Sequence, residues 1–316
     1  MNKEEIEAIS KTSTSQEVEW IKDREAIFKI KEAGKIAKQA VEYARTIIKP
    51  NMPLLEIANK IEEKIHSLKA KPAFPVNLSV NEIAAHSTPS YNDTTLATGL
   101  LKVDIGVHID GYVADNAFSL NLDSSEENKT LIKASEIALE EALKEIKLNV
   151  TLRKIGEVIE KACSSLKVQP IHNLSGHSID HYELHSGITI PNYDNAQEIE
   201  LPEGLYAIEP FTTFGVGSVK EGKGSGIYHI RKEGNVRDNF AREVLQFINK
   251  EYKTLPFCSR WIHKKFGTRG LLALRQIEQA GLLHHYPQLI ESSNMKVAQS
   301  EHSVLINKNE KIITTK

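Results

Sequence analysis

Cysteine is scarce in this chain. Only Cys163 and Cys258 occur among 316 residues, and they lie far apart without CxxC or CxH spacing. This excludes a disulfide framework and a cysteine-rich zinc site, and two isolated thiols are typical of a protein from a reducing compartment. We therefore expect a cytoplasmic protein in which both cysteines stay reduced.

An excess of charge is missing too, and so is a long apolar run. The chain has 40 Lys and Arg against 42 Asp and Glu, so its net charge of −2 gives no reason to expect a general nucleic-acid binder. No stretch approaches the roughly 18 apolar residues of a membrane span. The first residues, MNKEE, contain no apolar core of a signal peptide. We therefore expect a protein that is neither secreted nor embedded in a membrane.

Two widespread catalytic motifs are also absent. The glycine-rich segments 215–217 and 222–226 lack the helix start and the Lys-Ser/Thr pair of a phosphate-binding loop. No Gly-x-Ser-x-Gly segment occurs, so a serine-hydrolase elbow is excluded as well. Metal-activated hydrolysis is the chemistry that the remaining acidic residues and histidines favour.

The segment 102–119 predicts a β-hairpin whose turn is Asp110-Gly111, a dipeptide suited to the type I′ turn of a two-residue loop. In that register Asp104 and Asp115 share one face as diagonal neighbours, with Cα atoms roughly 7–8 Å apart. Gly106 lies opposite Asp115 and leaves room for something other than a side chain. Two carboxylates beside an apolar face need partners. They either bind cations or, as the alternative, merely begin or border strands.

The helical segments form an internal repeat. Residues 21–70 and 124–168 each contain two helical runs split by a break, and seven positions within them are identical at an offset of 98. Further along, Gly99-Leu-Leu-Lys-Val-Asp104 aligns with Gly204-Leu-Tyr-Ala-Ile-Glu209, so Asp104 corresponds to Glu209. Two halves related by a pseudo-twofold axis would bring equivalent carboxylate strands together, which is a natural frame for a two-metal site.

Histidines are frequent between residues 171 and 190. A single His is more often a core or surface residue than a ligand, so we expect His172 and His181 to be structural. His177 differs because it follows Gly176, as close packing near an ion would require. The set of candidate ligands is therefore one imidazole and four carboxylates: His177, Asp104, Asp115, Glu209 and Glu301.

This donor set matches two divalent ions in charge. A water molecule held between two such ions would be acidified toward hydroxide at neutral pH. Oxygen-dominated ligation with one imidazole suits Mn, Fe or Co. It favours Zn less exclusively than a Cys/His site would.

The last third of the chain contains a helix-rich segment followed by a segment that predicts strands. Residues 239–295 contain three helical runs, at 242–252, 261–266 and 270–280, followed by an extended piece, and they resemble a small winged-helix module. DNA binding is disfavoured, because this block is not markedly basic and interrupts a strand-rich domain. Residues 296–316 predict a closing hairpin that carries Glu301 in the middle of a strand.

The order Asp, Asp eleven residues later, His, Glu and Glu resembles the methionine aminopeptidases, specifically the type II class of archaea and eukaryotes. The resemblance extends from about residue 22 to the end and is carried by 85–89, 104–111, 115–118, 176–179, 207–211 and 299–302. It implies an α/β (α+β) pita-bread fold with pseudo-twofold repeated halves and a helical insert. The implied divisions are a polar tail at 1–20, a catalytic domain at 21–238 and 296–316, and the insert at 239–295.

The resemblance also implies roles for individual residues. The five ligands named above would bind two divalent metal ions (Co, Mn, Fe or Zn). His86 would hydrogen-bond the scissile peptide and assist proton transfer, and His185 would lie beside the substrate carbonyl. The implied substrate-binding residues are these two histidines and four others: Phe74, Leu184 and Phe211 around the methionine side chain, and Tyr286 on the cleft wall. Residues 212–230 match less closely, so we assign no substrate contact to them.

The activity implied is removal of the initiator methionine from nascent polypeptides, with a preference for a small second residue. The implied partners are nascent N-termini, and the resemblance implies a monomer and leaves docking on the ribosome open. An Xaa-Pro peptidase of the prolidase or aminopeptidase P type is an alternative, although those enzymes carry a separate N-terminal domain where this chain has a short polar tail. A non-catalytic binding relative is another, although it would lose ligands, whereas all five and His86 are present here.

Overall fold

The computed structural model describes residues 19–316, so the predicted tail at 1–20 lies almost wholly outside the described residues. A short 3₁₀-helix, Glu19–Lys22, opens the described chain. Six α-helices follow among the described residues: α2 Arg24–Ile47, α3 Leu54–Ser67, α4 Glu126–Glu145, α5 Leu152–Ser165, α6 Asn239–Glu251 and α7 Ser259–Gln279.

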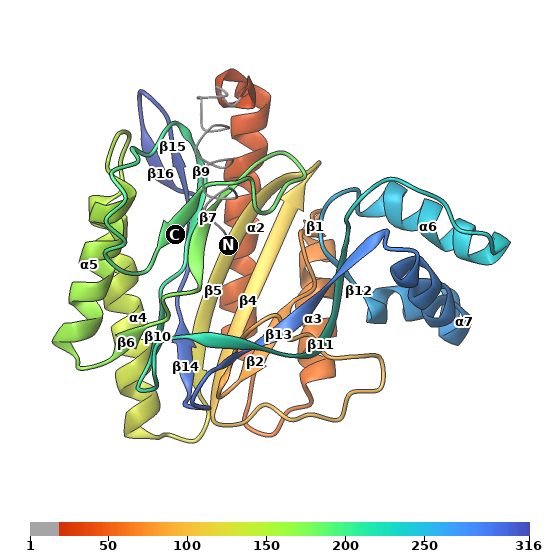
Figure 1. Cartoon of the computed structure of the whole chain (residues 1–316), viewed down its shortest axis with the longest axis horizontal. Coiled ribbons are helices and arrows are strands. Elements are labelled where there is room, and N and C mark those ends of the chain that lie inside the picture. Colours follow the sequence, from red (N-terminus) through yellow and green to blue (C-terminus); the bar gives the residue numbers. More distant parts are fainter. Residues whose placement is uncertain (1–18) are drawn as a thin grey trace.

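The strands of the described residues form four sheets. The first has β1 Lys71–Pro72, β2 Asn77–Val80, β4 Leu100–Ile109 and β5 Tyr112–Asn121, and the second has β6 Gln169–Pro170, β10 Phe211–Thr213 and β14 Val297–Gln299. The third has β3 Ile83–Ala85, β11 Val219–Ile230, β12 Phe257–Cys258 and β13 Leu283–Glu291. The fourth has β7 Ser175–Ile179, β8 Thr189–Pro191, β9 Gly204–Ile208, β15 His302–Ile306 and β16 Lys311–Ile313. Figure 1 shows β4 and β5 in the middle of the molecule, with α4 and α5 on the left and α6 and α7 on the right.

The predicted repeat is confirmed in the backbone. Helices α3 and α5 have equal length and begin 98 residues apart, at Leu54 and Leu152. The turns before them match as well, because Asn51 and Asn149 both take positive φ, 65° and 62°. Each half also has its own apolar core, the first built by α2, α3 and β4, and the second by α4, α5 and β9. The two halves are therefore repeated folding units of one α/β architecture, as the pita-bread fold requires.

Side-chain caps explain where four of these helices begin, including α6, where Asp238 accepts from the backbone N–H of Ala241 (2.8 Å). Asp23 accepts a hydrogen bond from the backbone N–H of Glu25 at the start of α2, and Ser125 and Thr151 cap α4 and α5 in the same manner. A side-chain oxygen at this position satisfies one of the N–H groups that a helix leaves without a partner. The starts of these helices are thus encoded locally.

The predicted hairpin is confirmed in every detail of its register. Asp110 and Gly111 form the turn with φ of 50° and 89°, Gly106 pairs with Asp115, and Asp104 pairs with Ala117. The expectation about Gly106 was wrong in one respect: a Cβ added there would lie 2.2 Å from Cε1 of Phe74. The ring of Phe74 fills this space, so the missing side chain at Gly106 makes room for a side chain from another segment.

Gly176 needs a similar correction. A Cβ added to this glycine would lie 2.4 Å from the carbonyl oxygen of Ala207 on the neighbouring strand β9. Gly176 therefore allows β7 and β9 to approach each other closely. Packing within the sheet, and not packing near an ion, explains why a glycine precedes His177.

The insert contains the expected helices and extended piece. Gly267, with φ of 63° and ψ of −160°, interrupts α7 between the two predicted helical runs. Strand β13 then pairs with β11 and also with β3, where Leu289 lies opposite Ala85. The extended piece of the insert thus belongs to a sheet that includes a strand of the catalytic domain, while the division at 239–295 remains a prediction.

The closing segment forms the expected antiparallel pair of β15 and β16, in which Val304 lies opposite Ile313. Glu301, however, does not lie within a strand. It occupies the break between β14 and β15, where its backbone N–H donates to the carbonyl of Ala117 on β5 (2.9 Å). Among the described residues, no helix is long and apolar enough to cross a membrane.

Candidate metal centre

The five predicted ligands come from both halves of the molecule and meet at one cavity of about 70 Å³. The first half supplies Asp104 from β4 and Asp115 from β5. The second half supplies His177 from β7 and Glu209 from the residue after β9, and Glu301 enters from the last segment. The strands that the repeat relates to each other therefore converge as predicted.

The ligand atoms lie close enough to share an ion. Nε2 of His177 is 3.6 Å from Oε1 of Glu209 and 3.9 Å from Oδ2 of Asp115. One donor atom from each of Asp115, His177 and Glu301 lies within 4.8 Å of the other two. Burial lowers the pKa of His177 well below its ordinary value, so its imidazole is neutral at pH 7. These contacts are therefore not ion pairs, and the ring has a lone pair available for a metal.

Several carboxylate oxygens at this site lack a donor. Oδ1 of Asp104, Oδ1 of Asp115 and Oε1 of Glu301 are buried and accept no hydrogen bond, whereas Glu209 accepts one from Nε2 of Gln299 (3.3 Å). Buried polar atoms without partners are rare and costly. A divalent cation would satisfy them, so the donor set fits a divalent metal site.

Electrostatics support the same conclusion. Burial raises the pKa of Asp115 to about 7. Burial and then repulsion from neighbouring carboxylates, Asp115 first, raise the pKa values of Asp104, Glu209 and Glu301 well above their ordinary range. Four acids that repel one another in an enclosed space hold protons unless positive charge is brought in. Cations and protons would therefore compete for these four carboxylates.

His86 lies beside these ligands on the cavity wall, directly after β3. Its backbone takes a φ of 56°, which is uncommon for a residue with a side chain and is typical of functional positions. Burial, with a smaller contribution from the nearby His185, lowers the pKa of His86 to about 4. Its Nδ1 is buried without a partner. A neutral imidazole with a free nitrogen thus lies at the edge of the metal cavity.

His185 also lines the cavity, and burial lowers its pKa to about 4. Its ring centroid is 4.4 Å from that of His177. The other two histidines of the 171–190 segment do not line the cavity: Nδ1 of His172 bonds with the carbonyl of Gly217, and Nε2 of His181 bonds with that of Asp110.

Most predicted substrate-binding residues line the same cavity. Phe74 and Leu184 contribute apolar surface, and the ring centroid of Tyr286 is 5.1 Å from that of His86. Phe211 does not line the cavity. Its side chain is buried in a separate apolar cluster with Ala84, Ile171, Val219 and Val297. The assignment of Phe211 to the methionine pocket is therefore not supported by its position.

Four lining residues were not assigned to the site from the sequence: Asn77, Ala85, Ile227 and Pro256. Asn77 had a signal, because the triplet Asn77-Leu-Ser recurs as Asn173-Leu-Ser in the second half. In the structure it lies opposite Asp104 in the β2–β4 pair, and its buried Oδ1 has no partner. Ile227 and Pro256 gave no comparable signal, since they reach the cavity from β11 and from the segment between α6 and α7.

Comparisons with known proteins fit this geometry. Residues 29–253 match metallopeptidase family M24. The chain is 47% identical to a methionine aminopeptidase of Pyrococcus abyssi over 91% of this chain and 98% of that protein. It is 43% identical to a methionine aminopeptidase of Methanocaldococcus jannaschii, again over 91% and 98% of the two chains.

Solved structures share the fold at lower identity. A thermophilic Arx1 aligns with a TM-score of 0.80 at 15% identity, covering 92% of this chain and 91% of that one. A methionine aminopeptidase of Thermotoga maritima aligns with a TM-score of 0.68 at 23% identity, covering 94% and 98%. The pita-bread architecture is therefore shared across proteins whose sequences have diverged widely.

Proposed function

Because this chain belongs to metallopeptidase family M24 and, within it, to the type II methionine aminopeptidases, we propose that it removes the initiator methionine from nascent polypeptides. The observation that carries this proposal is the convergence of Asp104, Asp115, His177, Glu209 and Glu301 on one cavity, with three buried carboxylate oxygens that lack donors. We propose two divalent ions there, because the four carboxylates match the charge of two such ions. Mn, Fe, Co and Zn are all compatible with these donors.

When bound, divalent ions supply the Lewis acidity that activates water for attack on a peptide carbonyl. Residues of the chain itself bind the substrate and transfer the proton. His86 is neutral at pH 7 and lies on the cavity wall, so its imidazole can hydrogen-bond the scissile peptide and pass a proton to the leaving nitrogen. His185 is neutral too and lines the same cavity, which supports a hydrogen bond from its imidazole to the substrate carbonyl.

Apolar side chains complete the pocket for the methionine side chain. Phe74, Leu184, Ile227 and Pro256 line the cavity, and they suit a thioether chain because they offer it no competing polar group. We infer the preference for a small second residue from the family alone.

The two alternative functions are less well supported. Curated relatives at 47%, 43% and 44% identity are methionine aminopeptidases, which favours methionine over an Xaa-Pro substrate. All five ligands and His86 face one cavity, which favours an enzyme over a non-catalytic relative. We propose that the protein acts in the cytoplasm as a monomer on nascent N-termini.

One assay tests the proposed function. Exhaustively chelated protein should not cleave Met-Ala-Ser, and addition of Co, Mn or Fe(II) should restore the release of methionine. Asp104→Ala and Glu301→Ala should lose metal and activity together, measured by metal content and peptide hydrolysis. Full activity after chelation, or faster cleavage of Xaa-Pro peptides than of Met-Ala-Ser, would refute the assignment.

A further inference from the structure

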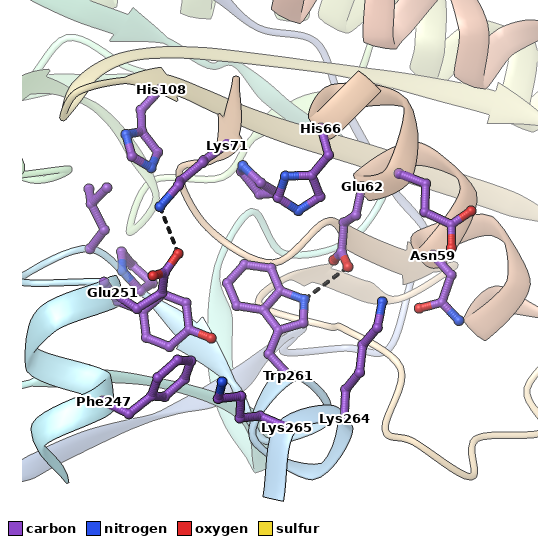
Figure 2. Close-up of a pocket in the computed structure, with 15 residues that line it drawn as sticks. Asn59, Glu62, His66, Lys71, His108, Phe247, Glu251, Trp261, Lys264 and Lys265 are labelled. Carbon is purple, nitrogen blue, oxygen red and sulfur yellow. Dashed lines mark hydrogen bonds and ion pairs between the residues drawn. The ribbon is translucent and has the colours of Figure 1, made fainter. Parts of the chain in front are cut away.

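A second cavity, larger than the metal cavity, lies between the catalytic domain and the helical insert. We call it the seam cavity, and it has a volume of about 330 Å³. One side is formed by α3, β1 and His108 of β4, and the other by α6, α7 and the segment 252–256 between them (Figure 2). Ligand sites in proteins typically have volumes of about 300–1,000 Å³ and often lie between domains. The seam cavity meets both criteria.

Aromatic side chains give this cavity a flat apolar surface. The rings of Tyr252 and Trp261 stack with centroids 5.5 Å apart, and Phe247 lies next to Tyr252 (5.8 Å). Trp261 is held in place because its Nε1–H donates to Glu62 of α3 (2.9 Å), as Figure 2 shows. Leu255 and Pro256 add further apolar surface. Such a surface favours a planar ring.

The charges around this surface are not balanced. Glu62 is paired with Arg260 (2.7 Å) and Glu251 with Lys71 (2.7 Å). Lys264 and Lys265 lie beside Trp261 in Figure 2, and neither forms an ion pair with any carboxylate in residues 19–316. Lys265 instead lies 5.1 Å from the ring centroid of Phe247. Glu63 also lines the cavity without an ion pair among the described residues and offsets one of these charges, so one net positive charge remains next to the aromatic surface and favours an anionic group on the ligand.

His108 adds a neutral hydrogen-bond donor to the wall of the cavity. The backbone N–H of Gly111 donates to its Nδ1 (3.0 Å), so in the neutral ring Nε2 carries the proton. Burial, followed by the charge of Lys71, lowers the pKa of His108 to about 4, which keeps this ring neutral at pH 7. Within the described part of the chain, Nε2 of His108 has no hydrogen-bond acceptor. An anionic oxygen in the cavity would provide one.

The seam cavity shares a wall with the metal cavity. Pro256 lines both of them. The adjacent Leu255 packs in one apolar cluster with Phe74 and Leu184, which line the metal cavity. Movement of the segment 252–256 would therefore change the shape of the pocket that receives the substrate side chain.

We propose that the seam cavity is a second ligand site, which binds a planar aromatic ring bearing a carboxylate or phosphate, and that its occupancy alters substrate binding through Leu255 and Pro256. The proposal goes beyond the peptidase activity, and only its second half depends on that activity. A ligand can act on the metal cavity in this way only if it favours one position of the shared wall over another.

Calorimetric titration of the metal-loaded protein tests the first half. The probes are 1-naphthoate and 1-naphthyl phosphate, with the uncharged 1-naphthamide and inorganic phosphate as controls for the anion and the ring. Both anionic naphthyl probes should bind at least tenfold more tightly than either control, a difference of about 1.4 kcal/mol. The relative affinity of the two probes distinguishes a carboxylate ligand from a phosphate ligand.

A matched pair of variants locates the binding. Lys264→Gln/Lys265→Gln should weaken both anionic probes at least tenfold, whereas Lys223→Gln/Lys250→Gln, with the same charge change outside the cavity, should not. Binding should persist in chelated protein and in excess methionine, because a probe bound to the metals would be lost under those conditions. Equal affinity for naphthoate and naphthamide, unchanged affinity in the cavity variant, or loss of binding on chelation would each overturn the proposed site.

Kinetics test the second half. Saturating 1-naphthoate should change KM for Met-Ala-Ser at least about twofold in the wild-type protein and much less in Lys264→Gln/Lys265→Gln. An unchanged KM in protein that binds the probe would refute the coupling while leaving the site intact. Because calorimetry needs no turnover, a failure of the proposed peptidase function would be recognised separately.

Discussion

At the scale of single residues, His86 combines two features that ordinary packing does not explain. Its backbone has a φ of 56°, and its buried Nδ1 has no partner. Both features carry a free-energy cost that folding alone gives no reason to retain. Thr88 anchors the segment that follows, because its hydroxyl donates to the carbonyl of Val76 (2.9 Å). The imidazole is therefore held at the cavity edge, where a substrate can supply the missing partner.

This arrangement predicts the behaviour of His86→Ala. The variant should keep a near-normal metal content and lose roughly 10²–10⁴-fold in kcat, the range for a positioned acid–base group. His86→Asn is the matched variant, since Asn tolerates positive φ and removes the imidazole without changing the backbone preference. Metal analysis and steady-state kinetics on both variants check this. Loss of metal from His86→Asn would mean that His86 is itself a ligand.

Tyr286 leads to a second prediction at this scale. Its ring contacts that of His86 edge-on and lines the metal cavity, so it can close one wall over the substrate. Tyr286→Ala should leave the metal content and the melting temperature nearly unchanged and lower kcat/KM about tenfold, or ~1.4 kcal/mol of lost binding. Tyr286→Phe, which keeps the ring, should stay close to wild type. A lower melting temperature with unaltered kinetics would show that the ring only packs the insert onto the core.

Residue roles were predictable from the sequence where the geometry is local. The register of the 102–119 hairpin follows from one turn dipeptide. The placement of Asp104 and Asp115 on the same face could therefore be predicted as well. The position of Phe211 outside the cavity, and the contribution of Ile227 and Pro256 to its lining, were not predictable, because the direction of these side chains depends on contacts between distant segments. The contact between the ring of Phe74 and Gly106 is another long-range contact, and the spacing of residues in the sequence does not predict it.

At the scale of elements, a buried ion pair joins α7 to α3. Arg260 of α7 donates to both carboxylate oxygens of Glu62 on α3 (2.7 Å each) and, through Nε, to the carbonyl of Pro89 (3.1 Å). Pro89 follows His86 by three residues. The same guanidinium thus contacts α3 and the segment that carries the proposed catalytic histidine.

Removal of one partner should therefore be costly. Glu62→Gln leaves the guanidinium of Arg260 buried without its counter-charge, and we expect a loss of about 3 kcal/mol in the free energy of unfolding. Glu56→Gln is the control on the same helix, because its partner Lys60 and Glu56 itself are both exposed and such a pair contributes less than about 1 kcal/mol. Urea unfolding of both variants checks this. Equal losses would show that burial of the pair is unimportant.

Most element boundaries were predictable, since breaks between helices carry their own signals. Prolines separate α2 from α3, and Gly267 interrupts α7 where two separate runs were expected. Glu301 was wrongly placed inside a strand, because residues 297–306 contain no Gly or Pro that would mark the break between β14 and β15. The break is set by a backbone hydrogen bond to Ala117 of β5, which is a tertiary contact.

At the scale of the whole molecule, the metal ligands connect the two repeated halves. Asp104 and Asp115 belong to the first half, and His177 and Glu209 belong to the second. The two halves share an apolar cluster that includes Val113 and Leu205, yet the acidic residues between them repel one another. Binding of cations should therefore stabilise the complete fold and not only the local loops.

The last prediction concerns how this stabilisation depends on pH. In metal-free protein the pKa of Asp115 is about 7, and those of Asp104, Glu209 and Glu301 are raised as well, so the folded state binds more protons than the unfolded state. The contribution of these groups to stability is present below their unfolded pKa of about 4 and is lost as pH rises toward 7. Metal binding requires the deprotonated carboxylates, so the gain in melting temperature on adding Mn should be larger at pH 8 than at pH 5.5. Scanning calorimetry at both values measures it, with Asp104→Ala as the variant in which the gain should be small throughout. An equal gain at the two pH values would contradict the idea that protons and metal ions compete for these four carboxylates.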